Sequence, residues 1–359
     1  MSESRQTIIV GTGSYVPTVR VPNEDFLDHE FFDASGRRIE RANADVIAKF
    51  QQITGIKERR YVSDDLVASD IATLAAQEAL ESSGFDRETL DYLIVAHNFG
   101  DVEAGSGRSD FCPTLAARTK QNLGIRNPGT VCYDLPFGCP GWLQAMIQAD
   151  YFLKSGDASS ALVIGAETLS RVCDPHDRDS MIYADGAGAT LIEAASGGGA
   201  GVLAHAARSD TLEYARLLNL GESNKPDCDD RTLFLKMAGH KLYEYALKTV
   251  PGLVRECLEK AGVEIGEVKK ILIHQANDKM DAAIIKRLYK LYGINDEDSD
   301  AVPMTISWLG NSSVATVPTL LDLLLKGNLD GHEVESGDLL VFASVGAGMN
   351  VNAMAYRMP

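Results

Sequence analysis

The chain has 359 residues, 45% of them hydrophobic and 24% charged, which is typical of a globular protein long enough for two domains. Its 34 Lys and Arg against 51 Asp and Glu give a formal net charge of −17, which argues against general nucleic-acid binding. No apolar run reaches the length of a membrane span, and no hydrophobic segment follows a basic start, so we expect a cytoplasmic protein without a signal peptide.

The first half of the chain alternates apolar, strand-like runs with segments of helical periodicity. A Gly-x-Gly turn follows the first run but lacks the third glycine of a dinucleotide fingerprint, which disfavours a Rossmann domain. A glycine-rich loop follows the second strand, and residues 212–231 show no period and are expected to be a surface excursion. The predicted strands cover 7–11, 92–96, 129–133, 161–165 and 184–191, and the predicted helices cover 68–83, 113–124 and 142–154.

Cys139 stands where the predicted strand at 129–133 turns into the predicted helix at 142–154. Gly138 and Gly141 flank it with little bulk, and Pro140 suits the first helical position. A helix N-terminus favours a thiolate, so this turn is suited to present a nucleophilic sulfur. A buried structural cysteine is the alternative. The six cysteines form no C-x-x-C pair and no zinc spacing, so we expect free thiols and no metal site.

The second half of the chain repeats the pattern of the first. The helix that ends at Gly84 and the strand after it resemble the helix that ends at Gly262 and its strand, 178 residues later. A similar offset, 172 residues, places Asn311 opposite Cys139. Two such repeats predict two parallel-type α/β layers packed together, with the site between the halves. We place the halves at 1–200 and 201–359.

Three further groups are predicted to join Cys139 at this site. His274 ends the strand at 269–273, Asn311 precedes the helix at 317–325, and glycines surround Ala347 after the strand at 339–343. The structural alternatives are that His274 is a core histidine and that Asn311 is a helix N-cap. A thiolate, two donor side chains and backbone N–H groups at Cys139 and Ala347 for an oxyanion fit acyl transfer through a thioester.

Six motifs along nearly the whole chain resemble those of the thiolase-fold condensing enzymes, most closely β-ketoacyl-acyl-carrier-protein synthase III. The resemblance implies a five-layer αβαβα sandwich made of two duplicated halves. The motifs are Gly11-Thr12-Gly13-Ser14-Tyr15-x-Pro17, Thr54-Gly55-Ile56-x-Glu58-Arg59-Arg60, Gly138-Cys139-x-Gly141-Trp142, Asp185-Gly186-Ala187-Gly188-Ala189, His274-Gln275-Ala276-Asn277 and Gly310-Asn311-Ser312-Ser313.

The resemblance implies a decarboxylating Claisen condensation of an acyl thioester with a malonyl-acyl-carrier protein. Cys139 would carry the acyl group, with its own N–H and that of Ala347 holding the oxyanion. His274 and Asn311 would donate hydrogen bonds to the malonyl thioester carbonyl. The family works as a homodimer and needs no metal or redox cofactor; acyl-coenzyme A or acyl-carrier protein enters as substrate.

The resemblance also implies surface contacts. The family's carrier-protein site lies beside the histidine helix, where this chain has Lys279, Lys286, Arg287 and Lys290; a solvated helix face is the alternative. Arg171 matches an arginine that contacts coenzyme A.

The sequence departs from the family in two places. The loop at 100–110 is longer, which indicates an altered acyl pocket. Lys49 and Ile53 replace the family's adenine-stacking tryptophan and a nearby arginine, so coenzyme A and a carrier protein both remain possible donors.

Two alternative activities remain open at this stage. The first is a same-fold enzyme that transfers the acyl group to an alcohol or amine, or that hydrolyses the thioester. A papain-like cysteine peptidase shares the Cys, His and Asn set, but its own cysteine signature and a secretory signal are missing.

Overall fold

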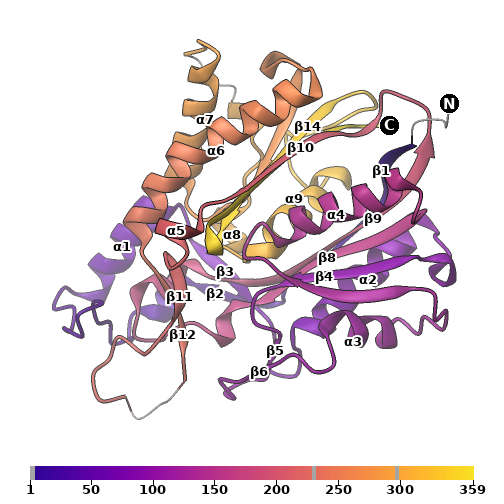
Figure 1. Cartoon of the computed structure of the whole chain (residues 1–359). Coiled ribbons are helices and arrows are strands. Elements are labelled where there is room, and N and C mark those ends of the chain that lie inside the picture. The colour runs from indigo at the N-terminus through magenta and orange to yellow at the C-terminus, as the bar shows by residue number, and fades with distance from the viewer. Residues whose placement is uncertain (1–4, 229–231, 296–298) are drawn as a thin grey trace.

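The computed structural model describes residues 5–228, 232–295 and 299–359, which build two main sheets and the helices packed on them (Figure 1). The first sheet has five strands. β4 runs parallel to its neighbours β8 and β7, whereas β9 runs antiparallel to β8 and β1. In spatial order the strands are β1 (Arg5–Tyr15), β9 (Asp185–Ser196), β8 (Ser160–Thr168), β4 (Tyr92–His97) and β7 (Val131–Pro136).

The second sheet has four strands and the same mixture of directions. β13 and β14 are parallel, and β15 pairs antiparallel with both β14 and β10. In spatial order the strands are β10 (Gly201–Ser209), β15 (Asn350–Arg357), β14 (Leu339–Gly346) and β13 (Val268–Ile273). Each sheet is therefore mixed: it contains the parallel strands of the predicted parallel-type layers together with antiparallel strands. β14 and β15 are joined by residues 347–349 alone, and so short a link requires antiparallel strands, whereas β8 and β9 are antiparallel across the longer connection 169–184.

Three helix layers complete a five-layer sandwich, which confirms the predicted αβαβα architecture (Figure 1). One apolar core joins an outer helix pair to the first sheet, another joins the central pair to both sheets, and a third joins the other outer pair to the second sheet. The pairs are α2 (Ala68–Ser83) with α3 (Leu115–Asn122), α4 (Gly141–Ser155) with α9 (Thr316–Leu325), and α6 (Gly239–Ala261) with α7 (Asp278–Leu291).

The residue patterns of these elements follow their layers. All nine residues of β8 and all eight of β14 are buried, because these strands have helices on both faces. α9 lies between the two sheets, and nine of its ten residues are buried. α2 buries only one face and ends at Gly84, whose φ of +67° suits a glycine C-cap.

Smaller elements surround the sandwich. The predicted loop at 97–110 contains a short hairpin, which Arg118 ties down through ion pairs to Asp101 at 2.6 Å and Asp110 at 2.8 Å. No helix in the described ranges is long and apolar enough to cross a membrane. The remaining elements are β2 (Val19–Pro22), β3 (Glu58–Tyr61), β5 (Asp101–Val102), β6 (Ser109–Asp110), β11 (Leu218–Gly221), β12 (Phe234–Met237), α1 (Asn43–Thr54), α5 (Thr211–Tyr214) and α8 (Ile306–Leu309).

The expectation that 212–231 is a plain surface excursion was wrong where the structure describes it. Residues 218–221 form β11, which pairs with β12 in an antiparallel hairpin. Leu218 and Leu220 of β11 and Leu235 and Met237 of β12 line a cavity. Residues 229–231, also within that expectation, lie outside the described residues.

Candidate active site

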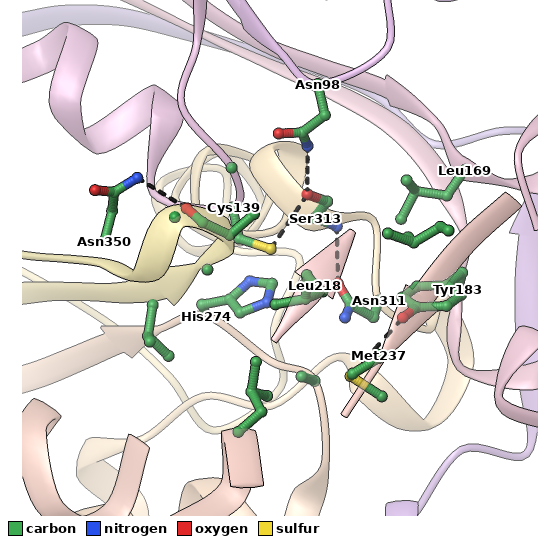
Figure 2. A pocket seen from close by; sticks show the side chains of 18 of the residues that line it. Asn98, Cys139, Leu169, Tyr183, Leu218, Met237, His274, Asn311, Ser313 and Asn350 are labelled. Carbon is green, nitrogen blue, oxygen red and sulfur yellow. Dashed lines mark hydrogen bonds between the residues drawn. The ribbon is translucent and has the colours of Figure 1, made fainter. Parts of the chain in front are cut away.

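A cavity of about 390 Å³ opens between the two halves and contains the predicted catalytic side chains. Cys139, His274 and Asn311 surround one space, although they come from three separate segments of the chain (Figure 2). Leucine and methionine side chains line much of the remaining wall. The arrangement combines a sulfur nucleophile, two polar side chains and an apolar compartment, which suits acyl transfer through a thioester.

Cys139 lies between the end of β7 and the start of α4, at the predicted turn. The helix begins at Gly141, so Pro140 is the N-cap residue rather than the first helical residue. Burial raises the pKa of the Cys139 thiol to about 11, and a hydrogen bond from Ser313 Oγ at 3.3 Å opposes that rise. The expected preference for a thiolate is thus outweighed by burial before any substrate is bound.

Two glycines bring the nucleophile turn against the end of β14. A Cβ atom on Gly346 would lie 2.6 Å from the Cys139 backbone nitrogen. A Cβ atom on Gly138 would lie 2.8 Å from the Ala347 backbone nitrogen, and Gly138 also has a φ of +72°. Only glycine allows this approach, which places the backbone nitrogens of the two predicted oxyanion donors in adjoining turns.

His274 directly follows β13, and its backbone N–H donates to the Ala343 carbonyl over 2.8 Å, which continues the pairing with β14. Burial of the ring lowers the pKa of His274 to about 4, so the imidazole is neutral near pH 7. Its Nδ1 atom has no hydrogen-bond partner within the described part of the chain. A neutral imidazole stabilises negative charge only as that charge develops.

Asn311 follows α8 and is held by its backbone between Ile182 and Ala184, at 3.0 and 2.8 Å. Its side-chain oxygen accepts a hydrogen bond from the Ser313 N–H at 2.8 Å. Asn311 therefore orders the turn before α9, which agrees in part with the alternative prediction that it is a helix N-cap. Because the oxygen is engaged, the amide nitrogen is the group available to a ligand.

Sequence reasoning missed two parts of this site. The first is the hairpin of β11 and β12, whose alternating Leu218 and Leu220 carried a weak two-residue period. The second is a polar network in which Asn98 and Ser313, both in the cavity wall, connect Glu167 to the nucleophile. No local pattern marks that network, because its members are far apart in the chain.

The four cations predicted to dock a carrier protein, Lys279, Lys286, Arg287 and Lys290, are all exposed on α7. The first turn of the same helix contributes Met280 to the cavity wall. The patch and the cavity therefore share one helix.

The structure places the other predicted contacts away from the cavity. The Arg171 side chain is only 7% exposed, lies 2.9 Å from the Ser63 carbonyl and 3.8 Å from Asp64, and does not line the cavity. Lys49 and Ile53 are exposed on α1, which contacts α7. Phe99 lines the cavity, but residues 100–110, all of them described, do not.

Comparisons with known proteins agree on one family. Two family models match, 3-oxoacyl-[acyl-carrier-protein] synthase III over residues 133–211 and its C-terminal counterpart over residues 258–358. A relative from Vibrio vulnificus, a beta-ketoacyl-[acyl-carrier-protein] synthase III, is 33% identical over 97% of this chain and 98% of its own length. Cys139 falls in the first matched segment, and His274, Asn311 and Ala347 fall in the second.

Solved structures give the same result for the fold. The 3-oxoacyl-[acyl-carrier-protein] synthase III of Aquifex aeolicus superposes with a TM-score of 0.79 at 30% identity, covering 98% of this chain and 99% of that one. The priming beta-ketosynthase of the R1128 polyketide pathway has a TM-score of 0.80 at 25% identity, covering 100% of this chain and 98% of that one.

Proposed function

This chain belongs to the 3-oxoacyl-[acyl-carrier-protein] synthase III family, and from that premise we propose how its pocket carries out the reaction. It is an acyltransferase that condenses an acyl thioester with a malonyl-carrier thioester, in fatty acid synthesis or polyketide priming. The observation that carries the assignment is the convergence of Cys139, His274 and Asn311 on one cavity.

The first half-reaction is acylation of Cys139. The sulfur attacks the carbonyl carbon of the donor thioester, the carbonyl oxygen becomes an oxyanion, and the donor thiol departs as the carbonyl reforms. The backbone N–H groups of Cys139 and Ala347 are proposed to hold that oxyanion. The close approach of Gly138 and Gly346 supports this role, because it holds the two turns in fixed contact before substrate arrives.

The second half-reaction forms the new carbon–carbon bond. His274 and Asn311 donate hydrogen bonds to the malonyl thioester oxygen while the bond to the carboxylate breaks and carbon dioxide leaves. The resulting enolate carbon attacks the acyl-Cys139 carbonyl, and the thiolate of Cys139 is released. The lowered pKa of His274 supports the role, because a neutral donor binds the negatively charged enolate oxygen more strongly than the uncharged carbonyl oxygen of the substrate.

The acidic carrier is proposed to dock on α7. Lys279, Lys286, Arg287 and Lys290 supply exposed positive charge on a chain whose formal net charge is −17. Because the condensation is redox-neutral and proceeds through a cysteine thioester, we propose that it uses no metal or redox cofactor.

A homodimer is proposed as the working form. The outer edge of β7 pairs with no other strand in the described chain, and Val131 on that strand is 49% exposed. Phe111, in the segment after the β5–β6 hairpin, is also 49% exposed. A free strand edge beside exposed apolar side chains is a surface that a second copy can cover.

The alternatives are not supported. A papain-like peptidase is contradicted by the thiolase-type fold and by the family match. The relatives matched over 96–98% of their length are named as condensing synthases, so hydrolysis or transfer to an alcohol or amine is not favoured.

The test of this function is a condensation assay. The protein is incubated with an acyl thioester and malonyl-acyl-carrier protein, and the 3-oxoacyl product and carbon dioxide are measured together. Equal amounts of the two are expected. Release of free fatty acid with no 3-oxoacyl product would instead establish hydrolysis.

A further inference from the structure

A line of hydrogen bonds leads from a buried carboxylate to the nucleophilic sulfur. The Asn98 amide nitrogen lies 2.5 Å from Glu167 Oε2 and 3.0 Å from Ser313 Oγ. Ser313 Oγ in turn lies 3.3 Å from Cys139 Sγ (Figure 2). Glu167 belongs to β8, Asn98 follows β4, and Ser313 opens the 3-10 turn before α9, so tertiary folding alone assembles the line.

The direction of these hydrogen bonds follows from what each group can donate. An ionised carboxylate only accepts, so Asn98 turns its amide nitrogen toward Glu167, and its backbone N–H donates to the same oxygen over 3.0 Å. The second amide proton then points to Ser313 Oγ. Because that hydroxyl already accepts from Asn98, its own proton is directed to the sulfur of Cys139.

Because these groups are buried, the direction of their hydrogen bonds affects the ionisation of Cys139. The side chains of Glu167 and Ser313 belong to residues that are 1% and 4% exposed, so water does not compete for their hydrogen bonds. A hydroxyl that donates to sulfur stabilises the thiolate, whereas the nearby charge of Glu167 alone raises the pKa of Cys139. Glu167 favours the thiolate only through Asn98, by holding the amide in its donating orientation.

We propose that Asn98 and Glu167 are positioning residues that hold the Ser313 hydroxyl as a dedicated donor to the Cys139 thiolate. The inference rests on the proposed function, because it concerns the nucleophile that is acylated. A merely structural role, in which Asn98 anchors the segment after β4, would leave the ionisation of Cys139 unchanged.

The experiment measures the rate of alkylation of Cys139 by iodoacetamide between pH 6 and 11, resolved by peptide mass spectrometry. The variants are Ser313→Ala and Asn98→Leu, alone and combined. Ser312→Ala is the matched control, because its hydroxyl lies 3.3 Å from Thr316 Oγ1, whereas the hydrogen bond to Cys139 in the described part of the chain comes from Ser313. The exposed thiol of Cys228 serves as an internal reference in every sample.

Below the midpoint of the profile, the alkylation rate of Cys139 is expected to fall by about 10- to 100-fold in Ser313→Ala and by about tenfold in Asn98→Leu, as for the loss of a hydrogen bond to a charged group. The double variant should match Ser313→Ala, because Asn98 acts through Ser313. The profile of Ser312→Ala should coincide with that of the unmodified protein.

An Asn98→Leu profile identical to that of the unmodified protein would overturn the proposal, as would shifts that add in the double variant. If the leucine variant does not fold by circular dichroism, Asn98→Ala replaces it under the same criteria. Alkylation requires no acyl donor, so the two claims separate. If the variants shift the profile but the protein forms no acyl-enzyme, the proposed condensation is rejected and the positioning role of Asn98 and Glu167 stands. If the protein forms the acyl-enzyme but the variants do not shift the profile, the positioning role is rejected and the condensation stands.

Discussion

The pKa values of individual pocket residues are shifted in opposite directions by one cause, burial. Burial raises the pKa of Cys139 to about 11 and that of Glu167 to about 7, and it lowers the pKa of His274 to about 4. Each shift favours the uncharged form of its group. At pH 7 Cys139 and His274 are therefore uncharged and Glu167 is partly ionised, and negative charge develops on the thioester oxygens only when the sulfur attacks or carbon dioxide leaves.

Variants of the two donor side chains, His274 and Asn311, should impair condensation and leave acylation of Cys139 intact. In His274→Ala, acylation of Cys139 should survive, while condensation falls by roughly 10²-fold or more, because a donor to the developing enolate is lost. Asn311→Asp should behave alike, since it keeps the oxygen that accepts from Ser313 and removes the donor. Single-turnover acylation and steady-state condensation are measured side by side. An equal loss in both half-reactions would contradict the assigned roles.

Glu167 should make the stability of the protein depend on pH. Its pKa is raised by burial from 4.5 to about 7, so the folded state binds the proton more tightly than the unfolded state. This contribution to stability is full below about pH 4.5 and is lost as the pH rises toward 7. Glu167→Gln lacks it, so its stability relative to the unmodified protein should rise over that interval, by on the order of 3 kcal/mol.

Urea unfolding at pH 5, 6, 7 and 8 measures this difference for the two proteins. The gain should level off above pH 7, where Glu167 is ionised in both states. A difference that is constant with pH, or that shrinks as the pH rises, would show that the buried carboxyl does not titrate in this way.

At the scale of elements, the site depends on two turns whose backbones touch and on one helix that carries charge at its surface. The turn between β7 and α4 meets the end of β14 through Gly138 and Gly346. α7 begins just after His274 and presents its cations to solvent. In the proposed mechanism the first contact affects acylation and the second affects recognition of the carrier, so separate variants should change the two separately.

Gly346→Ala tests the contact between the two turns. The added Cβ would meet the Cys139 nitrogen at 2.6 Å, so the turns must separate and the proposed oxyanion donors must move apart. Acylation should slow by about 10²-fold or more. Gly266→Ala is the control, since nothing lies within 4 Å of its added Cβ. Equal acylation rates in the two variants would argue against an oxyanion hole at this contact.

Charge reversal on α7 tests the docking surface. Lys279 and Lys286 are seven residues apart and so share a face of the helix. Lys279→Glu with Lys286→Glu should raise the KM for malonyl-carrier several-fold and leave that for a small malonyl thioester unchanged. Lys269→Glu is the control, because Lys269 is exposed and lies at the start of β13, the end of that strand away from His274. Equal effects on both substrates would remove the docking claim.

At the scale of the whole molecule, internal duplication explains what the sequence could predict. Each half repeats a strand, a turn and a helix with its own hydrophobic period, so the layers and the opposed turns of Cys139 and Asn311 follow from the pattern. The antiparallel strands were not anticipated, because periodicity does not report strand direction. The β11–β12 hairpin was missed because its four-residue strands are too short for a reliable period.

Long-range polar contacts lie beyond what a sequence pattern predicts. Asn98, Glu167 and Ser313 meet only after three segments have packed, and each residue type is common in loops and strand ends. Arg171 matches a family position, yet its guanidinium contacts Ser63 in this structure. A matched motif therefore locates a residue in the chain but does not fix the direction of its side chain.

The most direct test of the central claim is intact-protein mass spectrometry after incubation with acyl-coenzyme A donors from acetyl to long-chain, and with the same acyl groups on carrier protein. One acyl group per chain should be added, peptide mapping should place it on Cys139, and Cys139→Ala should remain unlabelled. An acyl group on another residue, labelling of Cys139→Ala, or no adduct with any donor would contradict an acyl-Cys139 intermediate.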